Sequence, residues 1–277
     1  MIFNRHLIFI LSLLLISGCA PNTEISLAKL NGKWINRLND YIEIADTTKN
    51  NNFIGNNVGT IGKYLQINGD TLSFQDRYTS SEDNFSTKRI DRSDFKINLL
   101  SDSILSISPI SKLASSLFDK DTIQFTKQEL AIDHTIDFDK ITFHSTRCYG
   151  HCPIYHLEVL KDGTTRLHRE EVYKKDENGL YLLDPLSIGY YTGKISKNKL
   201  KELKHHIQTC NLDRLTFNEI LCCDGSIETI IAEYNGKRKY LVDMFPPRIA
   251  SNLIGHLYLI CEESALKKTD TIFELDN

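Results

Sequence analysis

The sequence predicts two domains: an N-terminal all-β domain, an antiparallel meander or barrel-like structure, and a C-terminal α+β domain with an antiparallel sheet and two helices on one face. Residues 30–127 form short alternating runs separated by polar turns, which is typical of antiparallel strands. Residues 138–263 combine strand patterns with two segments of helical periodicity. About 259 residues remain after an N-terminal leader of 18 is removed, enough for two domains of roughly 100 to 150 residues.

The first 18 residues are predicted to form a signal peptide. A polar, basic lead at Asn4-Arg5-His6 is followed by an apolar run from Leu7 to Ile16. This run is too short to cross about 30 Å of hydrocarbon, which takes roughly 20 apolar residues. We therefore expect the leader to direct export and not to span the membrane.

The end of this leader, Ile16-Ser17-Gly18-Cys19, resembles the lipobox of bacterial lipoproteins. The resemblance implies cleavage before Cys19, a diacylglycerol on its sulfur and a fatty acyl chain such as palmitate on its amine. Several acyl chains anchor a protein stably where one binds reversibly. Ala20 resembles an outer-membrane sorting signal, and residues 19–29 read as a lipidated cysteine and tether. The alternative is an ordinary secretory signal that ends near a cysteine.

The composition of the chain limits its partners. Charged residues make up 25% of the chain, the formal net charge is −3, and no long block of one sign occurs. This charge pattern does not indicate binding to nucleic acid or to acidic lipid. We therefore expect a protein of the cell envelope at the outer membrane, which contacts the membrane through its N-terminal lipid.

Seven strands are expected in the N-terminal domain, separated by turn signals such as Asn68-Gly69-Asp70. Many short strands with polar turns favour a meander that curls into a barrel or a sandwich, and both remain open. Residues 50–52 and 78–84 are polar and are expected to form loop tips. The expected strands are Trp34–Leu38, Tyr41–Ile44, Thr60–Ile67, Thr71–Gln75, Phe95–Leu99, Ile104–Ser108 and Thr122–Thr126.

The start of this domain, Gly32-Lys33-Trp34, resembles the Gly-x-Trp opening of lipocalin-like domains. The resemblance implies a barrel in which the Trp34 side chain closes one end. Trp34 and Tyr41 are expected in the core or at the rim, and no set of catalytic residues occurs in this half of the sequence.

The C-terminal domain is expected to alternate strands with two helices, so that the helices cover one face of an antiparallel sheet. Ser196 is a candidate N-cap for the first helix, and Pro246-Pro247 precedes the second. Asn235-Gly236 is a strong signal for a two-residue hairpin turn. The expected elements are strand 141–143, hairpin 154–170, strand 187–195, helix 197–209, strands 226–234 and 237–243, a helix after 247, and a tail over 264–277.

The register of the hairpin around Lys161-Asp162-Gly163 can be predicted from its two faces. A two-residue turn would mix apolar and polar side chains on one face. A three-residue loop with Gly163 in the left-handed conformation separates them, so we expect that register. The opposed pairs are then Val159 with Thr165, Leu157 with Leu167, Glu158 with Arg166 and His156 with His168.

The motif Cys148-x-Gly150-x-Cys152-Pro153-x-Tyr155, with the Asp162-Gly163 turn after it, resembles a bacterial domain family of unknown function. That family occurs mostly in envelope lipoproteins of the Bacteroidetes kind, and the resemblance covers residues 138–263. It implies a fold and a compartment but no reaction.

Six cysteines remain as disulfide candidates in an oxidising compartment once Cys19 is lipidated. Cys148 and Cys152 can pair only if the chain turns back, because four extended steps separate their Cα atoms by about 13 Å against a limit near 7 Å. Gly150 makes that turn feasible. The candidates are Cys148, Cys152, Cys210, Cys222, Cys223 and Cys261.

Chain entropy favours a long-range pairing without deciding it. A bridge from Cys148 to Cys152 would stabilise by about 2 kcal/mol, whereas one to Cys222 or Cys223 would give about 4 to 5 kcal/mol. A second question concerns Cys210 and Cys261, which both lie on apolar helix stripes. A helix-to-helix bridge and two buried free thiols both fit that position.

A metal site is one candidate function of this region, because thiolates and imidazoles bind copper or zinc. The candidate ligands are Cys148, His151, Cys152, His156 and His168. Thiol redox chemistry is another, since Cys-x-x-x-Cys-Pro resembles the motif of Sco-type copper chaperones. In those proteins the motif leads into a helix that lowers the thiol pKa, whereas here an alternating strand follows Pro153.

Hydrolytic enzymes have less support, because no nucleophile elbow, His-Glu-x-x-His motif or phosphate loop occurs in the sequence. The sequence therefore predicts a lipid-anchored envelope protein that acts by binding or by architecture and not by catalysis. A partner protein or a small ligand is expected, and no cofactor is firmly implied beyond the covalent lipid on Cys19. A metal or thiol site in the C-terminal domain is the alternative.

Overall fold

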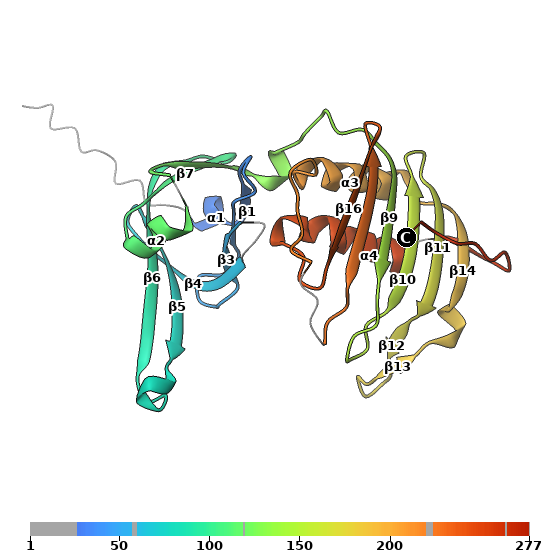
Figure 1. The fold of residues 1–277 in the computed structure, drawn as a ribbon, viewed down its shortest axis with the longest axis horizontal. Coiled ribbons are helices and arrows are strands. Elements are labelled where there is room, and N and C mark those ends of the chain that lie inside the picture. Colours follow the sequence, from blue (N-terminus) through green and yellow to red (C-terminus); the bar gives the residue numbers. More distant parts are fainter. Residues whose placement is uncertain (1–26, 57–59, 119, 220–223, 264, 277) are drawn as a thin grey trace, which may run out of the picture.

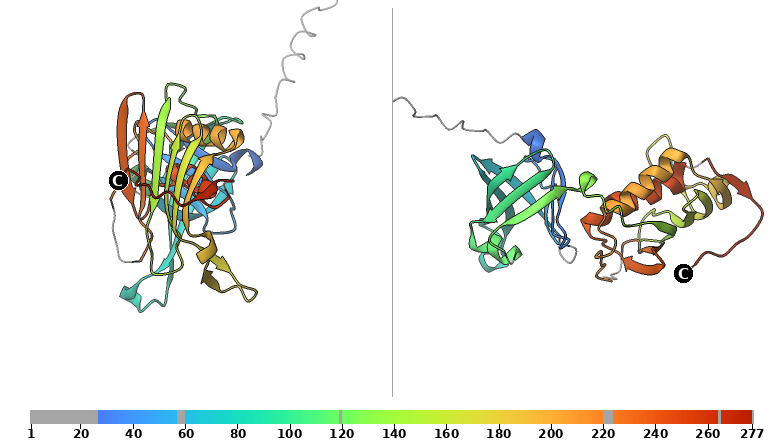
Figure 2. Two further views of the ribbon diagram at one scale, coloured as in Figure 1. Left: turned by 90° about the vertical axis from the view of Figure 1, so that its right-hand side faces the viewer. Right: turned by 90° about the horizontal axis from the view of Figure 1, so that it is seen from above.

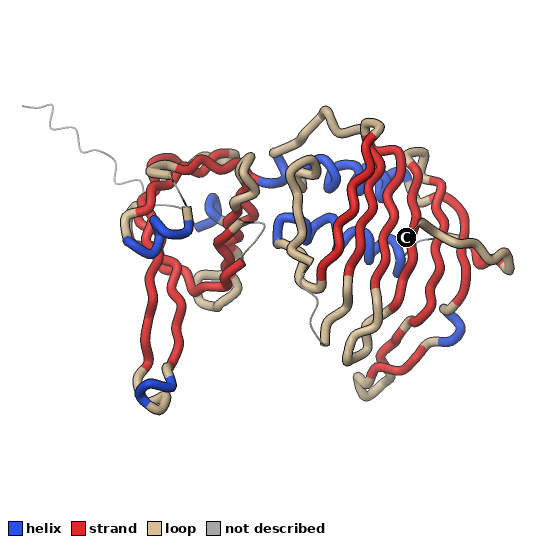
Figure 3. Tube along the Cα trace, viewed as in Figure 1, coloured by secondary structure: helices blue, strands red, loops and turns tan. Residues whose placement is uncertain are grey.

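The computed structural model describes residues 27–56, 60–118, 120–219, 224–263 and 265–276. A closed eight-stranded antiparallel barrel is followed by a seven-stranded antiparallel sheet with two helices on one face (Figure 1). Figure 3 separates the strands from the helices, and Figure 2 shows the barrel beside the sheet. Within the described ranges, no helix is long and apolar enough to cross a bilayer.

The barrel closes because its first strand, β1, pairs with its last, β8. A short helix, α1, precedes β1, and a second one, α2, lies between β7 and β8. The turn η1 (Ser81–Asp83) joins β5 to β6. The elements are α1 (Leu27–Leu30), β1 (Gly32–Ile35), β2 (Tyr41–Ile44), β3 (Asn52–Gly55), β4 (Thr60–Asn68), β5 (Thr71–Thr79), β6 (Lys88–Leu100), β7 (Ile104–Pro109), α2 (Lys112–Leu117) and β8 (Ile123–Lys127).

All seven strands predicted for this part of the chain form, and closure excludes the sandwich. The prediction missed β3, because Asn52 was expected in a loop tip. Asn52 is buried, and its amide satisfies the β2–β3 turn by accepting from Ala45 N (3.0 Å) and donating to Lys49 O (3.1 Å). The loop expected over 78–84 is shorter, because β5 and β6 continue as an exposed ribbon that projects from the barrel (Figure 1).

Side chains fill the barrel. Trp34 is fully buried beside α1, where its indole N–H donates to Leu30 O at 2.7 Å. Four phenylalanine rings form a chain of edge-to-face contacts, a geometry that aromatic pairs prefer. The centroids are 6.1 Å apart for Phe74 and Phe95, 5.8 Å for Phe95 and Phe118, and 6.2 Å for Phe118 and Phe125.

The sheet has the strand order β16-β15-β9-β10-β11-β14-β17, and every neighbouring pair is antiparallel. Helices α3 and α4 pack on one face (Figure 1). A separate ribbon of β12 and β13 projects beyond β11. The elements are β9 (Phe138–Ser145), β10 (Ile154–Leu160), β11 (Thr164–Glu171), β12 (Tyr173–Lys175), β13 (Tyr181–Leu183), β14 (Gly189–Lys194), α3 (Lys197–Thr209), β15 (Glu228–Tyr234), β16 (Lys237–Asp243), α4 (Ser251–Glu263) and β17 (Lys267–Thr269), with 3-10 turns η2 (Gln128–Leu130), η3 (Pro185–Ser187) and η4 (Arg248–Ala250).

The predicted hairpin register is confirmed for all four residue pairs. Gly163 has φ +83°, the left-handed conformation that the three-residue loop requires. Ser196 caps α3 by accepting from Lys199 N at 3.2 Å. Asn235 and Gly236 both have positive φ, as a type I′ turn requires.

Three short strands were not predicted: β12, β13 and β17. The two strands of the ribbon have three residues each, which is too short for a two-residue period to stand out. The segment 264–277 was expected to be a tail, but Lys267–Thr269 pairs with β14 and forms the edge of the sheet.

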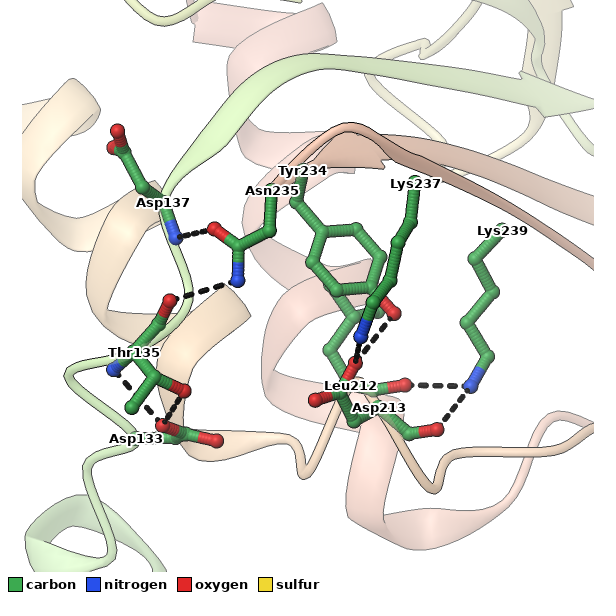
Figure 4. Close-up of polar contacts among 9 residues, drawn as sticks. All are labelled: Asp133, Thr135, Asp137, Leu212, Asp213, Tyr234, Asn235, Lys237 and Lys239. Carbon is green, nitrogen blue, oxygen red and sulfur yellow. Dashed lines mark hydrogen bonds and ion pairs between the residues drawn. The ribbon is translucent and has the colours of Figure 1, made fainter.

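The β15–β16 hairpin is fixed to the segment after α3 and to the connection from the barrel (Figure 4). Tyr234 and Lys237 both donate to Asp213 Oδ1, at 2.8 and 3.2 Å. Lys239 donates to two carbonyls in the same segment, at 2.6 Å for Leu212 and 3.0 Å for Asp213. In the turn, Asn235 accepts from Asp137 N and donates to Thr135 O. These lysines therefore hold the hairpin to the segment after α3.

The barrel also contributes to the core under the sheet. Ile35 and Tyr41, from β1 and β2, are buried in the same apolar cluster as the sheet and helix side chains. Polar contacts surround them: Asn211 donates to Asn39 Oδ1 at 2.7 Å, and Asn39 donates to Arg214 O at 2.7 Å. Directly after β8, the buried Gln128 donates to Thr209 O (3.3 Å) and Ile249 O (2.8 Å), which belong to the two helical segments.

We expect Gln128→Ala to lower the free energy of unfolding by about 1 to 3 kcal/mol, because two buried carbonyls lose their donor. Urea unfolding followed by circular dichroism measures the change. Gln124→Ala, at an exposed position of β8, is the matched control and should leave stability within about 0.5 kcal/mol. Equal stability of the two variants would show that Gln128 does not hold the helices to the barrel.

Candidate functional site

Four rings form one row across the face of the sheet opposite the helices. Side chains alternate between faces along a strand, so residues in register on neighbouring strands share a face. His144 on β9 opposes His156 on β10, which opposes His168 on β11, which opposes Tyr190 on β14. The same alternation sends the residues between them, such as Phe143 and Leu157, into the core under the helices. We call His144, His156, His168 and Tyr190 the ring row.

The rings contact one another along the whole row. His144 Nδ1 and His156 Nδ1 are 2.8 Å apart, a hydrogen-bond distance. The His156 and His168 rings stack with centroids 5.5 Å apart and planes 20° apart. His168 and Tyr190 stack more closely, at 4.2 Å and 5°. The stacking fixes the orientation of the His168 ring between its two neighbours.

A carboxylate joins the histidines where the β10–β11 register shifts between Ile154 and Tyr155, which leaves Glu170 as an extra residue of β11 beside them. Glu170 Oε2 is 3.2 Å from His156 Nε2. His156, His168 and Glu170 each offer one donor atom, and these atoms lie within 4.8 Å of one another. Among the described residues this is the one such group of three or more; we call it the donor cluster.

Burial keeps two of the histidines in the form that binds metals. Desolvation lowers the pKa of His144 and of His168, and the neighbouring His156 adds a smaller effect in the same direction. An imidazole with a lowered pKa is neutral at pH 7 and has a free lone pair. His144 and His168 therefore offer neutral imidazoles.

An ion-pair network beside the ring row engages the buried carboxylate of Glu158. Arg166 donates to both oxygens of Glu158, at 2.9 and 3.0 Å, as the predicted cross-strand pair requires. Lys140 lies 3.0 Å from Glu233 and also pairs with Asp276. Glu158 is therefore fully engaged in structural contacts.

The C-terminal segment, residues 270–276, crosses this face of the sheet (Figures 1 and 2). Two residues attach it. The ring of Phe273 contacts Tyr190 edge-on at 5.0 Å and lies 5.5 Å from the Arg166 guanidinium. The Asp276 carboxylate pairs with Lys140, and its main-chain oxygen is 2.7 Å from His144 Nε2. The segment thus contacts both ends of the ring row.

The structure joins Cys148 to Cys152, so the long-range pairing that chain entropy favoured is wrong for these two residues. Chain entropy acts on the unfolded state and does not decide which sulfurs the native fold brings together. Here β9 and β10 are adjacent and antiparallel, and their connection turns back at Gly150, leaving the two Cα atoms 5.6 Å apart. Cys19, Cys222 and Cys223 lie outside the described residues.

The other two cysteine candidates are free thiols in the structure, which is the second of the two alternatives for them. Cys210 and Cys261 are both buried. Burial raises the pKa of Cys210 to about 12 and raises that of Cys261 as well. Neither thiol forms a thiolate at neutral pH, so both act as small core residues.

The five predicted metal ligands do not form one site. Cys148 and Cys152 are bonded to each other and offer no thiolate. His151 lies against tyrosines of the β12–β13 ribbon, stacked on Tyr181 with centroids 5.7 Å apart. The structure brings together His156 and His168 as predicted, and it adds residues that the sequence analysis missed.

The missed residues are His144 and Glu170. The two-residue period does not by itself place Glu170, because the β10–β11 register shifts beside it. His144 directly follows the predicted strand 141–143, but its place in the row depends on the pairing of β9 with β10. No local sequence signal specifies that pairing.

A second, half-buried polar group lies at the other face of the sheet, beside α4. Tyr258 OH donates to Glu228 Oε1 at 3.2 Å. Burial, with a smaller contribution from Asp243 across the strand pair, raises the pKa of Glu228 to about 7. Asp243 itself is buried and accepts from Asn218 N and Phe245 N, both at 2.9 Å.

Comparison with known proteins places the ring row in a recognised but uncharacterised domain. Residues 139–252 match DUF6438, a domain of unknown function. The match contains the donor cluster and His144 and ends before the C-terminal segment. This agrees with the predicted C-terminal domain of unknown function and assigns no reaction. No curated protein and no solved structure shows a significant match to the chain.

We expect Glu228→Gln to remove a pH dependence of stability. Because the folded pKa is raised above the unfolded value, the native state binds more protons between the two, so stability falls as pH rises from about 4.5 to about 7. The variant should therefore gain up to about 3 kcal/mol over the wild type at pH 8 relative to pH 5. Urea unfolding at both values measures it. Glu177→Gln, at an exposed turn, is the control, and a parallel shift of both variants contradicts the assignment.

Proposed function

We propose that this is a lipid-anchored protein of the cell envelope, with domains over residues 30–127 and 138–263, which binds a divalent transition metal ion and does not catalyse a reaction. The donor cluster carries this proposal. Its three donor atoms converge within 4.8 Å from two paired strands, with His156 directly opposite His168 and Glu170 beside the register shift at Ile154.

The chemistry of the cluster selects the class of metal. Two imidazole nitrogens with one carboxylate suit copper(II), zinc and related first-row ions, whereas calcium and magnesium prefer oxygen ligands alone. Three ligands from one face leave further coordination positions open. A partner protein or a small ligand could complete them, so the site supports metal storage, delivery or metal-dependent association in the envelope.

Two observations support the compartment. A disulfide persists in an oxidising environment, and Cys148 is joined to Cys152. The lipobox-like residues before Cys19 supply the anchor, although they lie outside the described residues. The thiol-redox alternative has less support, because the second cysteine is followed by the strand β10 and not by a helix N-terminus.

We expect the purified protein to bind one zinc or copper(II) ion per chain, measured by isothermal titration calorimetry. His156→Ala/His168→Ala should weaken binding at least about 100-fold, because each ligand is a direct bond to the ion. His134→Ala, at an exposed position outside the ring row, is the matched control.

A further variant separates this site from the disulfide loop. Cys148→Ser/Cys152→Ser should keep full affinity, since those sulfurs take no part in the donor cluster. If the wild type binds neither ion, or if the histidine variant binds as tightly as the wild type, the metal proposal is wrong.

A further inference from the structure

We infer that the β12–β13 ribbon is a dimerisation surface, on which two copies of this chain join by antiparallel pairing of the outer edges of β13 about a two-fold axis at Leu182. The ribbon projects beyond β11 and contains no residue of the ring row (Figure 1). The inference depends on the exposed side chains and main-chain groups of this ribbon and not on metal binding.

The strand β13 exposes apolar side chains on both of its faces. Leu182 is 51% exposed on one face, and Tyr181 and Leu183 are 46% and 47% exposed on the other. No charged residue occurs from Leu180 to Leu183, and the pairing with β12 is regular. Natural edge strands usually carry a lysine, a proline or a bulge that prevents further pairing. The strand β13 has none of these, so its edge is open to another strand.

The hydrogen bonds of the ribbon show which main-chain groups face outward. Leu180 O accepts from Asp176 N at 2.9 Å, and Asp184 N donates to Val172 O at 2.7 Å. Because antiparallel strands alternate residues that bond to one neighbour with residues that face the other, every second residue of β13 points its N–H and C=O away from β12. These residues are Tyr181 and Leu183. In the described part of the chain no strand pairs with that edge.

This edge is complementary to itself. A two-fold axis at Leu182 sets Tyr181 of each copy opposite Leu183 of the other, so that all the outward N–H and C=O groups of both residues find partners. An axis at Tyr181 would instead set Leu183 opposite Gly179, which lies in the turn of the ribbon with φ +81°. An axis at Leu183 would set Tyr181 opposite Pro185, which has no N–H to donate. The axis at Leu182 is therefore the one that satisfies the edge.

The charges of the ribbon favour a second copy over a lipid surface as the occupant. Lys174 of β12 pairs with Asp184 of the same ribbon at 3.1 Å, so two copies meet without an unpaired charge beside the axis. The tip of the ribbon carries Asp176 and Glu177, which an anionic lipid surface would repel. A two-stranded ribbon alone is only marginally stable in water, and pairing with a second one makes a larger continuous sheet.

The disulfide loop holds the ribbon in position for this pairing. His151 of the loop lies between two tyrosines of the ribbon, edge-on to Tyr173 with centroids 5.2 Å apart and stacked on Tyr181 at 5.7 Å. The bond between Cys148 and Cys152 closes the loop that carries His151. Fixing the ribbon before association lowers the entropy that pairing would otherwise cost. The loop is thus a positioning element for the edge of β13.

Cysteine cross-linking of the purified protein in a glutathione redox buffer tests the position of the axis. The two copies of Leu182 would form a pair without mutual hydrogen bonds, in which the Cα atoms are about 4.5 Å apart and a disulfide can form. We therefore expect Leu182→Cys to give a covalent dimer on non-reducing electrophoresis. Leu180→Cys, on the same face, is the matched control: its counterpart lies about 13 Å away along the strand, so it should stay monomeric like the wild type.

Sedimentation velocity with a metal chelator present measures the association itself and excludes dimers bridged by an ion. The edge is smaller than a standard interface, so we expect a weak dimer that becomes evident below a chain concentration of about 1 mM. Leu182→Lys should abolish it, because two like charges would face each other at the axis. Phe85→Lys, which changes an exposed apolar residue at the tip of the β5–β6 ribbon, is the control and should dimerise like the wild type. His151→Ala should weaken the dimer by about 3- to 10-fold.

Three results would overturn the inference: a wild type that stays monomeric up to about 1 mM, a Leu182→Lys variant that dimerises as tightly as the wild type, or equal cross-linking of Leu180→Cys and Leu182→Cys. Cross-linking of Leu182→Cys in whole cells to a different protein, and not to a second copy, also contradicts it. Thermal unfolding of each variant verifies that it is folded, and the measurement on the wild type does not depend on any variant.

Discussion

The register between β10 and β11 is the constraint on which the ring row and the core under the sheet both depend. A shift of one residue would exchange the two faces, placing His156 and His168 under the helices and Leu157 and Leu167 in water. The loop at Gly163 opposes this shift. The three-residue loop that sets the register needs a residue at φ +83°, a conformation that is costly for any residue with a side chain, so the register follows the position of the glycine. A Cβ at this position would also meet Leu200 of α3 at 3.4 Å, so the turn and the helix are packed together. The tight turn thus specifies the core and the facing of His156 and His168, whereas Glu170 lies beside the register shift at Ile154.

The barrel acts as a support for this sheet and not as a container. Its interior is filled by aromatic and aliphatic side chains, whereas its outer surface supplies Ile35 and Tyr41 to the core under the sheet. Charged residues of the barrel also contact α4 and the turn before it: Lys33 donates to Ser251 at 2.7 Å, and Glu43 accepts from Arg248 at 3.1 Å. The Gly-x-Trp motif that resembles the start of lipocalin-like domains therefore occurs in a barrel whose interior is filled by its own side chains.

Local patterns were sufficient to predict most strands, the helices α3 and α4, the cap at Ser196 and the facing of His156 and His168, because each depends on residues close in sequence; the short helices α1 and α2 were not predicted. Two of the features that were missed depend on distant pairing. His144 joins the row only through the pairing of β9 with β10, and β17 forms only because β14 offers it an edge. The disulfide was misjudged for a related reason, since chain entropy describes the unfolded chain and the native strands determine which sulfurs meet. Asn52 was misjudged for a local reason. This polar residue is buried because its side chain hydrogen-bonds to the main-chain groups of the turn, Ala45 N and Lys49 O.

The acidic groups around the donor cluster differ in their contacts. Both carboxylate oxygens of Glu158 accept hydrogen bonds from the Arg166 guanidinium. Arg147 and Tyr173 donate hydrogen bonds to Glu171 and so lower its pKa. Among the described carboxylates beside the ring row, Glu170 is thus the one left to face the histidines, and it serves as a ligand. If the proposed metal ion binds, Glu170 is thus the carboxylate available to hold it.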